Sequence, residues 1–314
     1  MNIFLTGGTG FIGSYVAMEL ISNGHEITIL ARNRNKVPAL LKVKGIEIVQ
    51  GDLSDTKLLE ELIPGKDACI LVALKWGEQI GRKVLVEDTL PTVIMAGIAV
   101  EAKVKHFIYT SSTAANDHVY MVEQNKLDGL YKFVYSYSKQ HPSTFYGATK
   151  AASENFLLAQ SYLSSMRINI IRPGYTFGNP VIEGGSTQGD TRFHQIVKDA
   201  VANHPVKVVK TDGTQFIWAG DLAKLYTKVL NSDVNRKTYF GLAKNFISWE
   251  TIAKEAIKKC NSKSVIEVED RGWDPDGTTF DVSDMKNDFS LEFNGWEKIK
   301  EHLDYYIHME TKPK

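Results

Sequence analysis

Met1-Asn2-Ile3-Phe4-Leu5-Thr6 is a short apolar run that leads directly into Gly7-Gly8-Thr9-Gly10-Phe11-Ile12-Gly13. We expect a strand, a turn and then a helix, because residues 14–21 have a helical pattern that stops at Asn23-Gly24. Gly7 permits a tight turn, Gly10 lets the backbone approach a pyrophosphate, and Gly13 lets the helix pack closely. Unpaired N–H groups at the helix start favour the phosphates. The order predicts a dinucleotide site made by Gly7, Thr9, Gly10, Phe11, Ile12 and Gly13.

The strand and helix patterns go on alternating after this stretch. Strands are expected at residues 26–30, 46–49, 68–73, 105–110 and 168–171, and helices at residues 36–42, 56–62, 82–102 and 143–164. Pro91 lies within the longest of these helices and is expected to kink it. This order predicts an α/β protein with a doubly wound parallel sheet of the Rossmann type.

The alternation breaks after Arg172-Pro173-Gly174. Residues 183–190 are rich in glycine and polar side chains and are expected to form a loop over a cleft. Later helices at residues 249–259 and 296–306 suggest a smaller C-terminal lobe that binds the substrate. We therefore expect a cofactor-binding Rossmann domain from residues 1–173 and about 209–245, and a substrate lobe from about 174–208 and 246–314.

The composition sets limits on the function. The 314 residues carry 37 basic and 37 acidic side chains, so the net charge of zero does not suggest nucleic acid or an acidic membrane as a partner. The two cysteines, Cys69 and Cys260, cannot form a disulfide framework. With no signal peptide before the first strand and no long apolar run, we expect a cytoplasmic protein. No metal site is predicted.

The end of the second expected strand bears on the choice of nicotinamide cofactor. An acidic residue there would bind the adenosine 2′-hydroxyl, but the sequence is Ala31-Arg32-Asn33-Arg34. The Arg32 guanidinium suits a 2′-phosphate, so NADP is predicted in preference to NAD. The alternative is that these cations are a solvated helix start. Asp52 and Leu53 end the third strand, where Asp52 would bond the adenine amino group and Leu53 would pack on the ring, although a Gly-Asp pair is often only a turn.

Candidate catalytic groups lie at residues 110–150. Tyr146 and Lys150 are four residues apart, so on a helix both side chains lie on one face. A nearby ammonium lowers the pKa of a phenol, which lets the tyrosine exchange a proton with a substrate oxygen near neutral pH. Ser112 follows the fifth strand, where its hydroxyl would face the same cleft. Serines at a strand end are also common in turns.

These motifs together resemble the extended short-chain dehydrogenase/reductases, the NAD(P)-dependent epimerase/dehydratase superfamily. Similar elements continue along the chain, namely Ile171-Arg172-Pro173-Gly174, Asp221-Leu222-Ala223 and Asp281-Val282-Ser283, with a Leu-Gly pair replaced by Phe289-Ser290. The resemblance implies that Tyr146 is the catalytic acid/base. It implies that Lys150 lowers the pKa of this tyrosine and binds the ribose, and that Ser112 donates a hydrogen bond to the substrate oxygen.

Departures from the family pattern favour one branch. The strand end reads Ser112-Thr113-Ala114, without the acidic pair of the sugar-nucleotide dehydratases. Thr214-Gln215 stands where the epimerases carry Arg-Asp, so one phosphate clamp is missing, although Arg271 is a candidate for the second. The long insertion at residues 116–141 and the cationic second strand end look more like the dihydroflavonol- and aldehyde-reductase branch.

The sequence leaves two functions open. The first is NADP-dependent reduction of a ketone or aldehyde, or oxidation of the alcohol. The second is a sugar-nucleotide epimerase of the same superfamily, with NAD bound tightly. Loops at residues 116–141 and 181–192 would select the small-molecule substrate. Related families pair the helices at residues 82–102 and 143–164 between two subunits, so a homodimer is expected.

Overall fold

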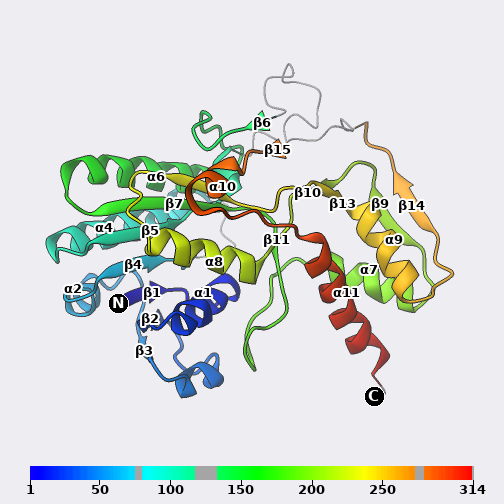
Figure 1. Ribbon diagram of the computed structural model, residues 1–314, viewed down its shortest axis with the longest axis horizontal. Helices are drawn as coiled ribbons and strands as arrows, with labels where there is room; N and C mark the ends of the chain where they lie inside the picture. Colours follow the sequence, from blue (N-terminus) through cyan, green and yellow to red (C-terminus); the bar gives the residue numbers. More distant parts are fainter. Residues whose placement is uncertain (75–79, 117–132, 273–278, 313–314) are drawn as a thin grey trace.

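The computed structural model describes residues 1–74, 80–116, 133–272 and 279–312. Its centre is a parallel sheet of seven strands in the order β12-β7-β5-β4-β1-β2-β3 (Figure 1). The strands are β1 (Asn2–Thr6), β2 (Glu26–Ala31), β3 (Ile46–Gln50), β4 (Ala68–Leu71), β5 (His106–Thr110), β7 (Arg167–Pro173) and β12 (Thr238–Gly241). The chain order reverses between β1 and β4, and this reversal is the point where such sheets bind ligands. The predicted Rossmann architecture is confirmed.

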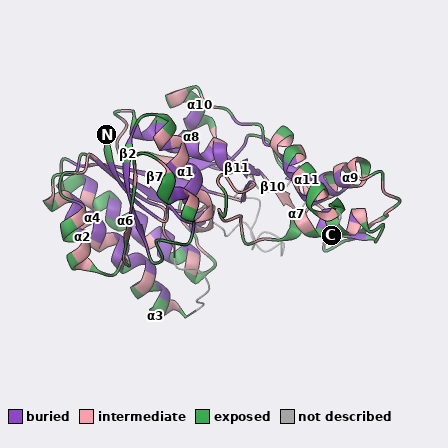
Figure 2. Cartoon of the chain, turned by 90° about the horizontal axis from the view of Figure 1, so that it is seen from below, coloured by how far each residue is buried: buried purple, intermediate pink, exposed green. Residues whose placement is uncertain are grey.

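Helices cover both faces of the sheet. Successive side chains of β1 alternate between the faces. Ile3 and Leu5 pack with α1 (Phe11–Ser22) and α8 (Ala219–Leu230), whereas Phe4 packs on the opposite side. That side is covered by α2 (Thr56–Leu62), α4 (Leu90–Glu101) and α6 (Phe145–Leu163). The inner strands β1, β4, β5 and β7 are therefore almost wholly buried between the two helical layers (Figure 2).

A second group of elements lies beside the Rossmann layers, on the right of Figure 1. It contains the helices α7 (Arg192–Val201), α9 (Trp249–Lys259) and α11 (Trp296–Thr311). Its short strands include β9 (Val206–Val209), β10 (Gly213–Thr214), β13 (Ile247–Ser248) and β14 (Ile266–Glu269). Aromatic side chains fill its interior, among them Phe193, Phe216 and Trp249. The domain boundaries given above remain predictions.

Asn179 connects this group to the Rossmann layers. The Tyr15 hydroxyl on α1 donates to the main-chain oxygen of Asn179 at 2.6 Å. The side chain of Asn179 hydrogen-bonds Nδ1 of His302 on α11 at 2.6 Å. Burial lowers the pKa of His302 to about 4, so this ring is neutral at neutral pH.

Two local expectations need correction. The helix expected at residues 36–42 is a short 3₁₀ helix, Pro38–Lys42. The helix expected at residues 82–102 is divided into α3 (Gly81–Val84), the π-helical turn η2 (Leu85–Thr89) and α4. Pro91 has no N–H to donate, and the wider π-helical turn lies directly before the helix that contains it.

Within the described ranges, the structure has no helix that is both long and apolar enough to cross a membrane.

Candidate active site

The glycine turn lies where the sheet reverses. Gly7 has a φ of +77°, a left-handed conformation that L side chains rarely adopt. A Cβ on Gly7 would lie 2.6 Å from the backbone nitrogen of Ala73, just after β4. A Cβ on Gly13 would lie 2.0 Å from the Gly7 carbonyl oxygen. These two positions admit only glycine because strand, turn and helix touch through their backbones.

The start of α1 suits an anion. Gly10 caps the helix without a side-chain hydrogen bond, and the first turn contains no acidic residue. The N–H groups and the positive end of the helix dipole therefore lie beside the turn without a carboxylate competing for them. Thr9 is buried, while Phe11 and Ile12 are partly exposed beside the turn. These residues fit the diphosphate of a dinucleotide, and their binding roles remain predictions.

The groups expected to bind the adenosine half lie at the ends of β2 and β3. Arg32 is the first residue after β2 and is exposed, and no ion pair involves it among the residues that the structure describes. Asp52 is exposed, and its Oδ1 accepts hydrogen bonds from the Ser54 amide at 3.0 Å and the Ser54 hydroxyl at 2.7 Å. These contacts form a turn, which is the alternative role that the sequence analysis gave to the Gly-Asp pair. Its proposed contact with adenine, and that of Leu53, remain untested.

A glycine that the sequence analysis did not single out, Gly147, joins the helix of Tyr146 and Lys150 to the turn that follows Ser112. Tyr146 and Lys150 lie on α6, with the Lys150 Nζ 5.8 Å from the centre of the Tyr146 ring. A Cβ on Gly147 would lie 2.2 Å from the carbonyl oxygen of Ala114. The first turn of α6 therefore packs directly on the turn that follows Ser112. Ser112 is partly exposed, and its Oγ accepts from the Ala114 amide at 3.1 Å.

Lys150 is only 2% exposed, so its charge needs partners inside the protein. Its Nζ lies 3.3 Å from Oδ2 of the equally buried Asp88 on η2 and 5.1 Å from the centre of the Tyr109 ring. Burial by itself lowers the pKa of a lysine, but Tyr109, Asp88 and Tyr146 outweigh it and raise the pKa of Lys150 above its ordinary value. Asp88 was missed because it lies inside an expected helix. The sequence did hold a signal for a buried charge at this position. Asp88 lies four residues from Val84 and four from Thr92, both of which are buried.

A second buried ion pair lies one turn further along α6. Arg172, at the end of β7, donates from Nε to Glu154 Oε1 at 2.9 Å and from Nη2 to Oε2 at 2.6 Å. Glu154 also accepts hydrogen bonds from Ser111 and Gln140. Because Ser111 precedes Ser112, this pair holds the strand end that carries a predicted catalytic hydroxyl.

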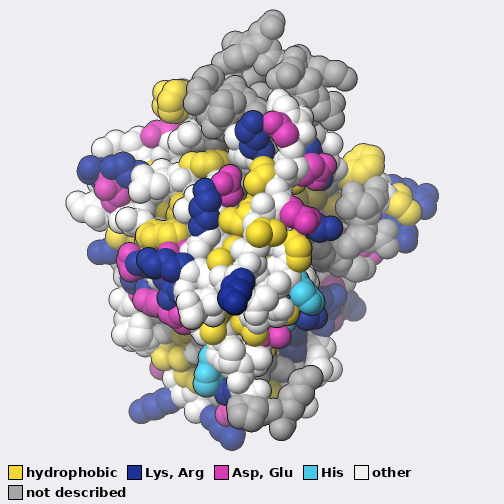
Figure 3. Space-filling view, turned by 90° about the vertical axis from the view of Figure 1, so that its right-hand side faces the viewer, with side chains coloured by type: hydrophobic (Ala, Val, Ile, Leu, Met, Phe, Trp, Pro, Cys, Tyr) yellow, Lys and Arg dark blue, Asp and Glu magenta, His cyan; other side chains and the backbone are white. Residues whose placement is uncertain are grey.

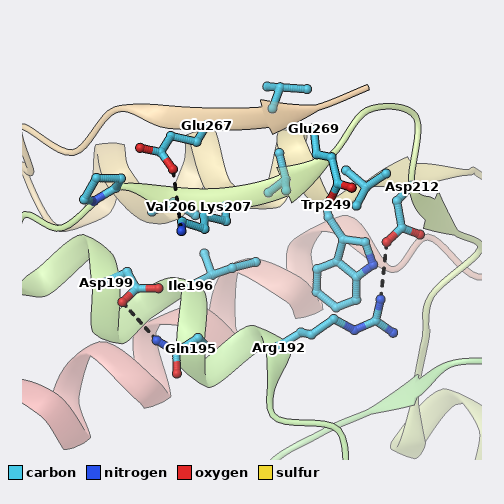
Figure 4. Close-up of a pocket in the computed structure, with 14 residues that line it drawn as sticks. Arg192, Gln195, Ile196, Asp199, Val206, Lys207, Asp212, Trp249, Glu267 and Glu269 are labelled. Atoms are coloured by element: carbon cyan, nitrogen blue, oxygen red, sulfur yellow. Dashed lines mark hydrogen bonds and ion pairs between the residues drawn. The ribbon is translucent and has the colours of Figure 1, made fainter. Parts of the chain in front are cut away.

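A cavity of about 690 Å³ lies in the second group of elements, between α7 and the strands β9 and β14 (Figure 4). The guanidinium of Arg192 lies 4.4 Å from the centre of the Trp249 ring in its wall. Arg192 also pairs with Asp190 at 2.7 Å and with Asp212 at 3.4 Å.

Basic and acidic side chains are interspersed on the face shown in Figure 3. Residues 117–132 of the expected substrate loop lie outside the described residues.

The residues at the positions of the two epimerase phosphate clamps make contacts within the protein. Thr214 lies in β10 and pairs with Ile247 of β13. Gln215 is 1% exposed, and its amide donates to the carbonyl oxygens of Ala243 and Phe280 and accepts from the Phe280 amide. Arg271 forms a bidentate pair with Glu269 at 2.9 and 2.8 Å.

The fold and this arrangement are those of nucleotide-dependent enzymes built on a Rossmann sheet. Residues 3–240 match the model of the NAD dependent epimerase/dehydratase family, and the chain belongs to that family.

Similar proteins include dehydrogenases of a sterol and of a steroid, and an epimerase of a sugar nucleotide. A decarboxylating sterol-4-alpha-carboxylate 3-dehydrogenase of Dictyostelium discoideum is 33% identical over 57% of this chain and 54% of its own length. A 3 beta-hydroxysteroid dehydrogenase/Delta 5→4-isomerase of Mycobacterium tuberculosis is 26% identical over 64% of this chain and 52% of its own. The match thus spans about half of these relatives. A UDP-glucose 4-epimerase of Neisseria meningitidis is 40% identical over 19% of this chain and 20% of its own length.

Solved structures agree on the fold. The UDP-glucuronic acid 4-epimerase of Bacillus cereus in complex with NAD superimposes with a TM-score of 0.79 at 18% identity, covering 99% of this chain and all of that one. The enzyme WbmG of Bordetella bronchiseptica, also with NAD, gives a TM-score of 0.79 at 17% identity over 99% and 95% of the two chains.

Proposed function

We propose that this protein is an NADP-dependent oxidoreductase that reduces a ketone or aldehyde, or oxidises the corresponding alcohol. The proposal is carried by Tyr146 and Lys150 on α6, whose first turn packs on the turn that follows Ser112. The resemblance to a sterol carboxylate dehydrogenase and a hydroxysteroid dehydrogenase/isomerase supports it. The contacts of Gln215 and Arg271 also support it, because either side chain would have to give up hydrogen bonds within the protein in order to bind a diphosphate.

Each residue has a chemical role in this reaction. When bound, NADP(H) would supply or accept the hydride. Ser112 would donate a hydrogen bond to the carbonyl oxygen, which orients it. Tyr146 would give this oxygen its proton in reduction and take it back in oxidation. Lys150 would place a positive charge beside the phenol and bind the ribose hydroxyls. Arg32 would bind the 2′-phosphate.

A sugar-nucleotide epimerase is the second candidate. The short stretch of 40% identity to the Neisseria UDP-glucose 4-epimerase favours it. Purification separates the two functions, because an epimerase recycles its cofactor and would retain NAD, whereas a reductase would exchange NADPH with solvent.

The proposal is tested by a screen of carbonyl compounds for consumption of NADPH, followed by Tyr146→Phe on the best substrate. The substitution keeps the ring and removes the transferable proton, so turnover should fall by about a hundredfold or more. Ser112→Ala should lower turnover with nearly unchanged NADPH affinity, since its partner is the substrate. Full activity of Tyr146→Phe would contradict the mechanism.

We further propose a reducing, cytoplasmic location, since both cysteines are free and Cys69 is buried.

We also propose a homodimer that forms through α4 and α6. Exposed apolar side chains on these two helices support it, namely Leu90, Phe156, Leu158, Tyr162 and Leu163.

A further inference from the structure

We propose that Asp88 is a positioning residue that keeps Lys150 charged and fixed beside Tyr146. The inference rests on the proposed function, because it concerns the residue that would bind the ribose and assist the tyrosine. Asp88 itself touches neither Tyr146 nor a substrate in this assignment. It acts through the ammonium of Lys150, 3.3 Å from its Oδ2.

The local structure brings this carboxylate to Lys150. Asp88 lies on the π-helical turn η2, on the face packed against α6, and is 2% exposed. The same Oδ2 accepts a hydrogen bond from the Thr149 hydroxyl at 3.2 Å. The Thr89 hydroxyl donates to the Thr149 carbonyl at 3.3 Å, and the Thr92 hydroxyl donates to the Asp88 carbonyl at 2.8 Å. The two helices are thus joined by a buried polar cluster around the ion pair.

The surroundings of Lys150 leave Asp88 as its counter-charge. The titratable groups that face it are Asp88 from η2, Tyr109 from β5, Tyr146 from its own helix and Tyr226 from α8. Burial raises the pKa of both Tyr109 and Tyr226, so these two phenols are neutral at neutral pH. The Tyr226 hydroxyl is also held by the Thr110 hydroxyl at 2.7 Å. Among the described neighbours, Asp88 therefore carries the negative charge.

Removal of that charge should change the lysine. A fully buried lysine without an anionic partner loses its proton at a pH several units below its ordinary pKa. A neutral amine would place no positive charge beside the phenol and would bind ribose hydroxyls more weakly. Asp88 would therefore set the upper pH at which the site retains its cation.

The experiment is carbon-13 NMR of the full chain labelled at lysine Cε, with the Lys150 signal identified by its absence in Lys150→Met. In the unaltered protein, the Lys150 signal should not titrate up to pH 10. In Asp88→Asn, its midpoint should fall by roughly three pH units. Thr149→Val is the matched control, because it removes the neutral partner of the same oxygen and should leave the midpoint unchanged. Asp88→Glu, which keeps the charge, should keep the lysine protonated.

NADPH affinity measured by fluorescence gives a second readout. When the pH is raised from 7 to 9.5, the affinity for NADPH should fall further in Asp88→Asn than in the unaltered protein. The additional loss should be on the order of tenfold, the scale of one hydrogen bond to a charged group. An unchanged Lys150 midpoint in Asp88→Asn would overturn the proposal. If this variant does not fold, a Lys150 signal that titrates below pH 10 in the unaltered protein would overturn it equally. Neither measurement needs a substrate, so a failure to find a reducible carbonyl compound would count against the proposed function alone.

Discussion

Gly13→Ala adds one carbon where the turn and α1 touch. This carbon would lie 2.0 Å from the carbonyl oxygen of Gly7 and 3.0 Å from the Cα of Gly8. It would have to retreat by about 1.4 Å to reach the 3.4 Å of ordinary contact, and the neighbouring atoms are backbone that cannot rotate away. The helix must therefore move relative to the turn.

The expected energy follows from two opposing effects. Alanine in place of glycine inside a helix gains about 1 kcal/mol. Overpacking a well-packed position costs about 1–3 kcal/mol. The backbone clash places Gly13→Ala toward the upper end of this cost, so the free energy of unfolding should fall by about 1–2 kcal/mol. NADPH binding should fall by about a hundredfold, the scale of a displacement of 1 Å in a positioned site.

Urea unfolding and fluorescence titration with NADPH measure these two effects. Gly97→Ala is the matched control, since Gly97 is also helical, on α4, and nothing lies within 4 Å of its added Cβ. It should gain about 0.5–1 kcal/mol and bind NADPH normally. If Gly13→Ala were as stable as Gly97→Ala and bound NADPH equally well, the close-packed turn would not be the reason for glycine here.

Two further predictions concern the cofactor and the assembly. Arg32→Asp should raise the dissociation constant of NADPH much more than that of NADH, as measured by fluorescence titration, and equal effects on both would defeat the assignment of NADP. Phe156, whose side chain is 58% exposed on α6, lies on the predicted subunit interface. Phe156→Glu should therefore convert a homodimer into a monomer in sedimentation experiments, whereas an unaltered protein already monomeric at micromolar concentration would rule the dimer out.

The elements that the sequence predicted well are those determined by local pattern. The strand, turn and helix of residues 1–22 were expected because a short apolar run, glycine spacing and helical periodicity all agree over a short stretch. The helices at residues 56–62 and 249–259 begin and end where the pattern placed them. Asp55 and Ser248 cap them by accepting from Leu58 and Thr251.

Other features depend on backbone adjustments that periodicity does not reveal. The π-helical turn before Pro91 lies within residues 82–102, where one continuous helix was expected, and only the proline suggested a disturbance. Ser290 is another case, because it replaces the glycine of the family pattern while its φ is +56°. The left-handed conformation is kept although the residue that adopts it most easily is absent.

The two buried ion pairs could not be predicted because their partners are distant in sequence. Asp88 and Lys150 are joined by the packing of η2 on α6, and Glu154 and Arg172 by the packing of α6 on β7. A buried pair adds little net stability, since the cost of desolvating two charges offsets their attraction. What each pair provides is a fixed position for its side chains. Lys150 and Glu154 are one turn apart on α6, so the helix is held at Lys150 by η2 and at Glu154 by Arg172 and the Ser111 strand end. Tyr146 precedes both on this helix, and its position therefore depends on charges that would contact no substrate.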